Sequence, residues 1–253
     1  MSFDLLLQFE WPVLLTICVA ALVTSTIHGA TGLAGGMLMA AALATLIGVK
    51  PVVPVMSVAL LISHSSRALI NAKNIDRSVL LLVCSASLPV LVLVSAFYGR
   101  MTSTGIGLLL GTLLLVSIPI RYWGSKRNMH TNKTGLAAAA AVYGGLSGAS
   151  VGPGMVLSPF MLSYGMQREA FVATMALIAL STNVARVVVF GGTDQLMDGY
   201  ITLGLFIGLL TIPGNWLGRS VLRRMSNQSH GYAVDVLTVI AAINFFYLAL
   251  VKS

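Results

Sequence analysis

Charged side chains are scarce in this chain. Only 9% of its 253 residues are Asp, Glu, Lys or Arg, and the acids number 7 against 15 bases. A soluble domain carries about 25% charged residues to cover its surface, so this composition excludes an ordinary soluble protein. Hydrophobic residues make up 57% of the chain, and the mean hydropathy is +0.92. The sequence therefore predicts a protein whose solvent is lipid.

Motifs for catalysis and for tightly bound cofactors are missing as well. The sequence has no HExxH, GxSxG or P-loop GK[ST] motif, and its glycine clusters lack the preceding strand and following acid of a dinucleotide fingerprint. Cys18 and Cys84 lie apart in apolar runs, which supports neither a disulfide nor a metal site. We therefore expect no enzyme, no cofactor and no metal. The net charge of +8 does not indicate a nucleic-acid partner, because the bases fall in short loops between apolar runs.

Long apolar runs are what the chain has in abundance. A helix needs about 20 apolar residues to cross the hydrocarbon core, and most runs reach that length. The predicted elements are residues 11–31, 34–48, 51–72, 78–98, 103–121, 135–150, 153–165, 168–191, 198–218 and 231–251. Elements 34–48 and 153–165 are shorter, and each begins at a glycine-rich break, residues 29–36 and 144–154. The predicted fold class is an all-α polytopic membrane protein with short broken helices at these breaks.

The two halves of the chain resemble each other. Gly35-Gly36-Met37 aligns with Pro153-Gly154-Met155, and Arg67 aligns with Arg186. Internal duplication is a common plan of transporters. With five crossings per half the two repeats are inverted; if the short elements dip in and return, the repeats could instead be parallel. The predicted organisation is one transmembrane domain, 1–253, with repeat one at 11–121, a cytoplasmic loop at 122–134 and repeat two at 135–251.

Charge predicts the orientation of these elements. The loops Arg121–Lys133 and Arg219–His230 are rich in Lys and Arg, so the positive-inside rule places them in the cytoplasm. The segment Gly192–Asp198 carries two acids and no base, which suits the outside. Alternation from these loops places both termini outside.

Two arginines lie within the apolar elements. Arg67 follows His64 by three residues and Arg186 follows Asn183 by three, a spacing that places each pair on one helical face. An ionised side chain inside a membrane marks a substrate or ion pathway by default. Two arginines at matching places of a repeat therefore favour a carrier for an anion. The alternative is snorkelling to the interface, because each arginine lies only about five or six residues from a predicted helix end.

The glycine-rich breaks provide the other part of the predicted site. Irregular backbone at membrane depth is tolerated only where it is buried in protein or lines a watery cavity. A short helix that begins there directs its free N–H groups and positive dipole end at that place, and glycine lets the backbone approach an oxyanion. The predicted substrate-binding residues are Thr31, Gly32, Gly35, Gly36, His64, Arg67, Ser150, Gly152, Gly154, Asn183 and Arg186.

Other residues near these positions are interpreted differently. Close helix packing is the alternative role of a glycine in a membrane, and we assign it to the pairs Gly107/Gly111, Gly204/Gly208 and Gly214/Gly218. Tyr143 is interpreted as a packing residue or interface anchor. The polar side chains His28, Ser147 and Thr182 lie close in sequence to the predicted site, and His28 or His64 could carry a proton.

These features resemble the TauE/SafE family, the sulfite exporter family, also called the 4-toluene sulfonate uptake permease family. The resemblance covers residues 12–250. It rests on the signatures Gly32-Leu-Ala-Gly-Gly36 and Ser150-Val-Gly-Pro-Gly154 and on the late run from Ile212 to Met225. It implies a secondary transporter of the bacterial inner membrane for sulfite, sulfonates or related sulfur-containing anions.

We therefore expect a transporter that works by alternating access, with both termini in the periplasm. The anion would bind between the repeats on backbone N–H groups, and Arg67 and Arg186 would neutralise its charge or gate each side. The expected partners are the small anion and the lipid bilayer; coupling to protons and a homodimer stay open. The alternatives are a transporter of another small anion, such as a carboxylate, and a non-transporting membrane scaffold.

Overall fold

The computed structural model describes residues 9–31, 35–70, 72–126, 130–197, 199–222 and 227–251, and within these ranges the chain is helical without a strand. Two short 3-10 turns, Ala72–Asn74 and Tyr98–Arg100, interrupt the helices. The α-helices are α2 (Trp11–Thr31), α3 (Gly35–Ile47), α4 (Val49–Ile70), α5 (Arg77–Phe97), α6 (Ser103–Lys126), α7 (Lys133–Ala149), α8 (Gly154–Ser163), α9 (Arg168–Gly192), α10 (Tyr200–Leu222) and α11 (Asn227–Val251).

The helices confirm the predicted class of polytopic helical membrane protein. Among the described residues, six helices are long and apolar enough to cross a bilayer, namely α2, α4, α5, α6, α9 and α10. Their outer faces carry exposed apolar side chains such as Leu81 of α5, Val188 of α9 and Leu209 of α10. A soluble protein rarely exposes large apolar areas, whereas lipid contact requires them.

The predicted helix ends differ from the observed ones where the chain turns basic. The apolar run of α6 ends near Ile120, but the helix continues to Lys126, inside the segment predicted as a loop. Likewise α11 begins at Asn227, before the predicted start at residue 231. Hydropathy marks where the chain leaves the hydrocarbon, whereas a helix ends only where its hydrogen bonding stops.

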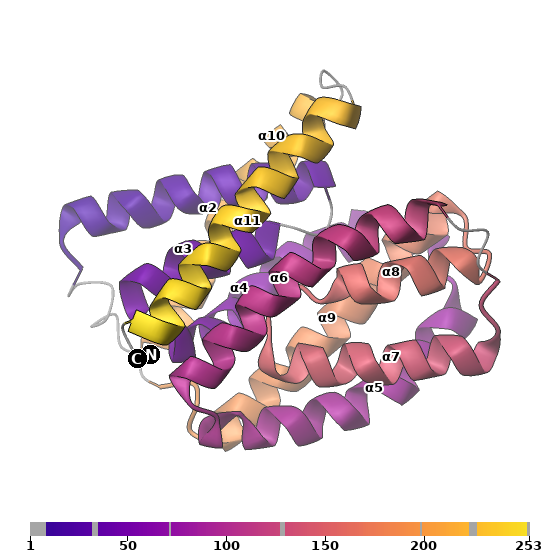
Figure 1. Cartoon of the computed structure of the whole chain (residues 1–253), viewed down its shortest axis with the longest axis horizontal. Helices are drawn as coiled ribbons and strands as arrows, with labels where there is room; N and C mark the ends of the chain where they lie inside the picture. The colour runs from indigo at the N-terminus through magenta and orange to yellow at the C-terminus, as the bar shows by residue number, and fades with distance from the viewer. Residues whose placement is uncertain are drawn as a thin grey trace.

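The first two helices of each half form a hairpin, and the two hairpins enter from opposite ends of the molecule (Figure 1). In the second hairpin the Thr131 N–H donates to the Ser163 carbonyl at 3.2 Å, so the start of α7 and the end of α8 lie together. In the first hairpin Gly35 of α3 packs on Thr24 and His28 of α2. Both short helices therefore begin inside the molecule and return to the end from which their hairpin entered.

The packing of the helices has the same pattern in both halves. Helix α2 packs against α10, and α7 packs against α5; α4 also contacts α10, as α9 contacts α5. Helices α4 and α9 pack on each other, as do α6 and α11. When helices α2–α6 are replaced in this pattern by α7–α11 and the reverse, the same contacts result, so the two halves are structural repeats. Because their hairpins enter from opposite ends (Figure 1), the repeats are inverted rather than parallel.

Contacts at the helix ends show which loops share a face. Lys50 donates from Nζ to the Gly99 carbonyl at 2.8 Å, and Tyr98 donates to the Lys50 carbonyl at 2.7 Å. At the opposite end the Asp76 N–H donates to Thr174 Oγ1 at 2.9 Å. The predicted alternation of loops agrees with these contacts. Which face lies in the cytoplasm stays a prediction.

The glycine-rich break of the second half is shorter than predicted. Helix α7 continues through Gly144 and Gly148 as far as Ala149, and only residues 150–153 leave the helix. The prediction of a break over 144–154 was wrong there because these glycines serve packing: Gly144 lies on the backbone of Ser87, and Gly148 lies on Val94, both in α5. In the first half α2 extends to Thr31 and α3 begins at Gly35; residues 32–34 lie outside the described residues.

Close glycine contacts also join other helix pairs. A Cβ at Gly107 would lie 2.8 Å from the Cβ of Ala249 in α11, and one at Gly204 would lie 2.7 Å from the Val55 carbonyl oxygen in α4. The helices pack this tightly because no side chain separates their backbones. The packing role predicted for Gly107/Gly111 and Gly204/Gly208 is confirmed, and Gly214 of the third pair packs on Leu22 and Ser25 of α2.

Gly144→Ala tests the contact between α5 and α7. Its Cβ would lie 2.7 Å from Ser87 Cα and 2.8 Å from Ser87 C, so the two helices must separate. Overpacking of this kind costs about 1–3 kcal/mol, and we expect a lower unfolding temperature in detergent. The adjacent Gly145→Ala is the matched control, because its Cβ meets nothing closer than Val90 Cγ1 at 3.5 Å. Equal unfolding temperatures for the two variants would contradict the close packing.

Candidate functional site

A cavity lies between the two repeats, where the hairpins meet α4 and α9. Repeat one lines it with His28, Gly36, Leu60 and His64, and repeat two lines it with residues of α7, of the break before α8, and of α9. Its volume is about 50 Å³. A site at the interface of inverted repeats is the place where transporters bind their substrates.

Arg186 is the charged group of this cavity. Its side chain is 2% exposed. The guanidinium donates from Nη1 to the Ser150 carbonyl at 2.7 Å and from Nη2 to Asn183 Oδ1 at 2.5 Å. Its buried Nε has no hydrogen-bond acceptor among the described residues. Both recorded partners are neutral oxygen atoms, so the positive charge of Arg186 remains uncompensated by them. This position also excludes snorkelling as the role of Arg186.

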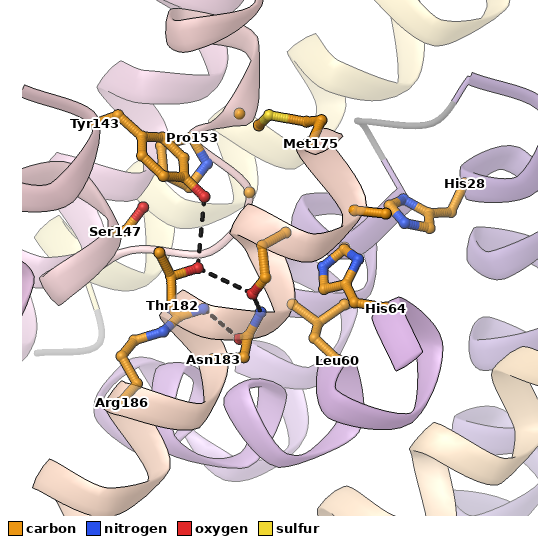
Figure 2. Close-up of a pocket in the computed structure, with 15 residues that line it drawn as sticks. His28, Leu60, His64, Tyr143, Ser147, Pro153, Met175, Thr182, Asn183 and Arg186 are labelled. Carbon is orange, nitrogen blue, oxygen red and sulfur yellow. Dashed lines mark hydrogen bonds between the residues drawn. The ribbon is translucent and has the colours of Figure 1, made fainter. Parts of the chain in front are cut away.

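Asn183 is oriented toward Arg186 by its own helix. Its Nδ2 donates to the Ala179 carbonyl one turn earlier, at 2.7 Å, which turns Oδ1 toward the guanidinium. The spacing of three residues along α9 brings the two side chains to one face, as predicted. Figure 2 shows both side chains at the edge of the cavity, with their hydrogen bond drawn.

The break before α8 brings backbone to the cavity. Gly152 has φ of +74°, in the left-handed region that glycine adopts without strain. Gly152, Pro153 and Gly154 line the cavity, and α8 begins at Gly154 without a side-chain cap. The N–H groups of its first turn and the positive end of its dipole therefore lie at the cavity, beside the charge of Arg186.

Hydroxyl groups of α7 and α9 complete this side of the cavity. Thr182 Oγ1 donates to the Ala179 carbonyl at 2.9 Å, and the Tyr143 hydroxyl lies 3.5 Å from Thr182 Oγ1 (Figure 2). Since the proton of Thr182 is directed to Ala179, Tyr143 is the donor of the second bond. Ser147, one turn after Tyr143, lines the same wall.

Two histidines form another part of the wall. His28 of α2 and His64 of α4 are buried, and their rings meet edge to face with 5.9 Å between centroids. Figure 2 shows them on the opposite side of the drawn cluster from Tyr143 and Arg186. Gly35 fixes the place of His28, because a Cβ at residue 35 would overlap the His28 side chain and the Thr24 carbonyl.

The structure brings many of the predicted substrate-binding residues together. Those that line the cavity are Gly36, His64, Gly152, Gly154, Asn183 and Arg186. Ser150 contributes its carbonyl to Arg186, while its hydroxyl bonds to the Leu146 carbonyl at 2.5 Å. Gly35 lies behind the wall, against His28. Gly32 and the side chains of Thr31 and Arg67 lie outside the described residues.

Sequence reasoning gave only part of the role of Tyr143. It packs in a buried apolar cluster of α5, α7, α8 and α9, as interpreted, and it also forms part of the cavity wall. The available signal was its position one turn before Ser147, on the same face of α7. His28, Ser147 and Thr182 were recognised as nearby polar residues and also line the cavity.

Taken together, the cavity offers donors and positive charge to a ligand. Comparison with known families agrees with a site for an anion: residues 17–245 match the family described as "Sulfite exporter TauE/SafE". No curated protein and no solved structure matches the chain. The match covers the second hairpin, most of the first and the whole wall of the cavity.

Gly152→Ala tests the contribution of the break to the cavity. A Cβ at left-handed φ costs about 1–2 kcal/mol, and relief of that strain would move the backbone at the start of α8. Gly165→Ala is the matched control, because Gly165 also has positive φ, +101°, and has open space where its Cβ would go. We expect similar losses of thermal stability in both variants. Only Gly152→Ala should weaken anion binding, measured by calorimetry with sulfite and sulfate; unchanged binding would contradict the role of the break.

Proposed function

The chain belongs to the sulfite exporter TauE/SafE family, a family of membrane transporters, and we propose that it is a secondary transporter that moves a small sulfur-containing anion across the bacterial inner membrane. Sulfite, sulfonates and related organosulfur anions are the proposed substrates. The observation that carries this proposal is the burial of Arg186, 2% exposed, at a cavity between inverted repeats.

The chemistry of the cavity favours an anion over a cation. Arginine keeps its charge under all physiological conditions, and an isolated charge is costly to bury. An anion in the cavity would offset that cost. Its oxygen atoms would accept from the free Nε–H of Arg186 and from the N–H groups at the start of α8. No Asp or Glu is among the residues that line the cavity in the described part of the chain.

The opposed hairpins support alternating access as the mechanism. Each short helix begins inside the molecule, so a small rotation of one repeat against the other can open the cavity to one end and close it to the other. Arg67 occupies the place in α4 that Arg186 occupies in α9. We propose that Arg67 serves the anion in the second half of the cycle, as Arg186 does in the first.

Asn183→Asp places a carboxylate at hydrogen-bond distance from Arg186 with little change of shape. The new ion pair would neutralise the guanidinium, so we expect anion binding to weaken by about tenfold or more, on the scale of ~1.5–3 kcal/mol for bonds to charged groups. Asn183→Ser is the control, since it removes the amide acceptor without adding charge and should weaken binding less. Calorimetry in detergent measures both variants. Equal affinity of wild type and Asn183→Asp would contradict the anion site.

Arg186→Gln and Arg67→Gln test transport itself. Loss of a buried charged partner costs ~2–5 kcal/mol, so we expect uptake of sulfite into proteoliposomes to fall by about 30-fold or more. The control is Arg77→Gln, at the exposed start of α5. Size-exclusion chromatography separates lost function from lost folding.

Normal uptake by folded Arg186→Gln would contradict the proposed mechanism, and uptake of small carboxylates in place of sulfur anions would favour the alternative substrate class. A scaffold would show no uptake even as wild type.

A further inference from the structure

The mechanism proposed above leaves the buried histidine pair without a role. His28 and His64 come from different helices, are 6% and 8% exposed, and both line the cavity that contains Arg186. Their rings are 5.9 Å apart between centroids. Membrane interiors retain ionisable residues chiefly on substrate and proton pathways.

We propose that His28 and His64 together bind one proton when the anion binds, so that anion and proton cross the membrane in the same step. This inference rests on the proposed function and assigns it a coupling ion. The proton site is the imidazole pair on α2 and α4, and the anion site is the group of donors around Arg186 on α9.

Among the described residues that line the cavity, few other groups are able to change charge. Helix α11, which contacts α3 and α4, carries Asp235. Helix α9 presents Arg186 and α7 presents Tyr143 to the cavity. Arginine keeps its charge, and phenols in general titrate well above neutral pH. Helix α3 has no titratable residue, and α10 presents Thr211 and Asn215 to this region. Arg67 follows His64 on α4, with its side chain outside the described residues.

The coupling follows from electrostatics within the cavity. An anion close to an imidazole stabilises its protonated form. By linkage, a proton on the pair raises the affinity for the anion by the same factor. Two protonated rings in contact would repel each other, so the pair takes up a single proton and titrates as a unit.

A proton that accompanies the anion also eases its passage. A sulfonate carries one negative charge, which the added proton cancels for the loaded protein. Movement of one elementary charge against a membrane potential costs about 2.3 kcal/mol per 100 mV. This electrical cost vanishes when the charges of the anion and the proton cancel. With the two ions moving together, a proton gradient directed into the cell would drive uptake of the anion.

The test is calorimetric titration of the full-length protein with methanesulfonate and with sulfate, whose charges stay constant where histidine titrates, about pH 5 to 8. Measurement in buffers of different ionisation enthalpy counts the protons taken up. We expect uptake of up to one proton per anion and a dissociation constant that rises with pH by up to tenfold per pH unit. In the double variant His28→Gln/His64→Gln the uptake and the pH dependence should both disappear while binding persists at the high-pH affinity.

His130→Gln is the matched control, because His130 is an exposed histidine before α7 and should leave proton uptake unchanged. Anion binding by wild type without proton uptake would overturn this inference and leave the proposed function intact. Proton uptake retained in the double variant would overturn it as well. Failure of sulfite, sulfate and methanesulfonate alike to bind to wild type would instead contradict the proposed function itself.

Discussion

The need to accommodate a buried guanidinium constrains the arrangement of the second repeat. Arg186 requires acceptors inside the helical bundle, where most backbone carbonyls already accept along their own helices. The break after α7 releases the Ser150 carbonyl, and Asn183 supplies a side-chain oxygen from one turn earlier on α9. These two acceptors leave the buried Nε without an acceptor among the described residues. A longer helix at residues 150–153 would remove both the Ser150 acceptor and the free N–H groups of α8.

Glycine determines how closely the rest of the bundle surrounds this charge. Gly144 and Gly148 bring α7 onto α5, and Gly35 brings α3 onto α2, so that both hairpins reach the cavity without intervening side chains. Membrane helices gain little from apolar burial against one another, because lipid is equally apolar, and packing therefore depends on close approach of backbones. The same residue type thus serves two purposes in this chain, close packing within helices and irregular backbone between them.

That double use explains which features the sequence could predict. The helices followed from the length of the apolar runs, and the pair Asn183 and Arg186 followed from a spacing of three on α9. The extent of the second break could not be predicted, because glycines that pack against α5 and glycines that leave the helix form the same kind of sequence run. The packing of Tyr143 was predicted, but its place in the cavity wall was not, because the direction of its hydroxyl depends on the contact between α7 and α9, which spans distant parts of the chain.

The two repeats are alike in shape but differ in chemistry at the cavity. When Arg67 is aligned with Arg186, His64 corresponds to Asn183. Repeat one lines the cavity with His28 and His64, whose charge depends on pH. Repeat two lines it with neutral hydrogen-bonding groups and with Arg186, whose charge stays fixed. Since both sets line one cavity, a ligand held there contacts the pH-dependent and the fixed elements at once. Neither repeat alone supplies both, so the coupling inferred for this protein requires the interface between them.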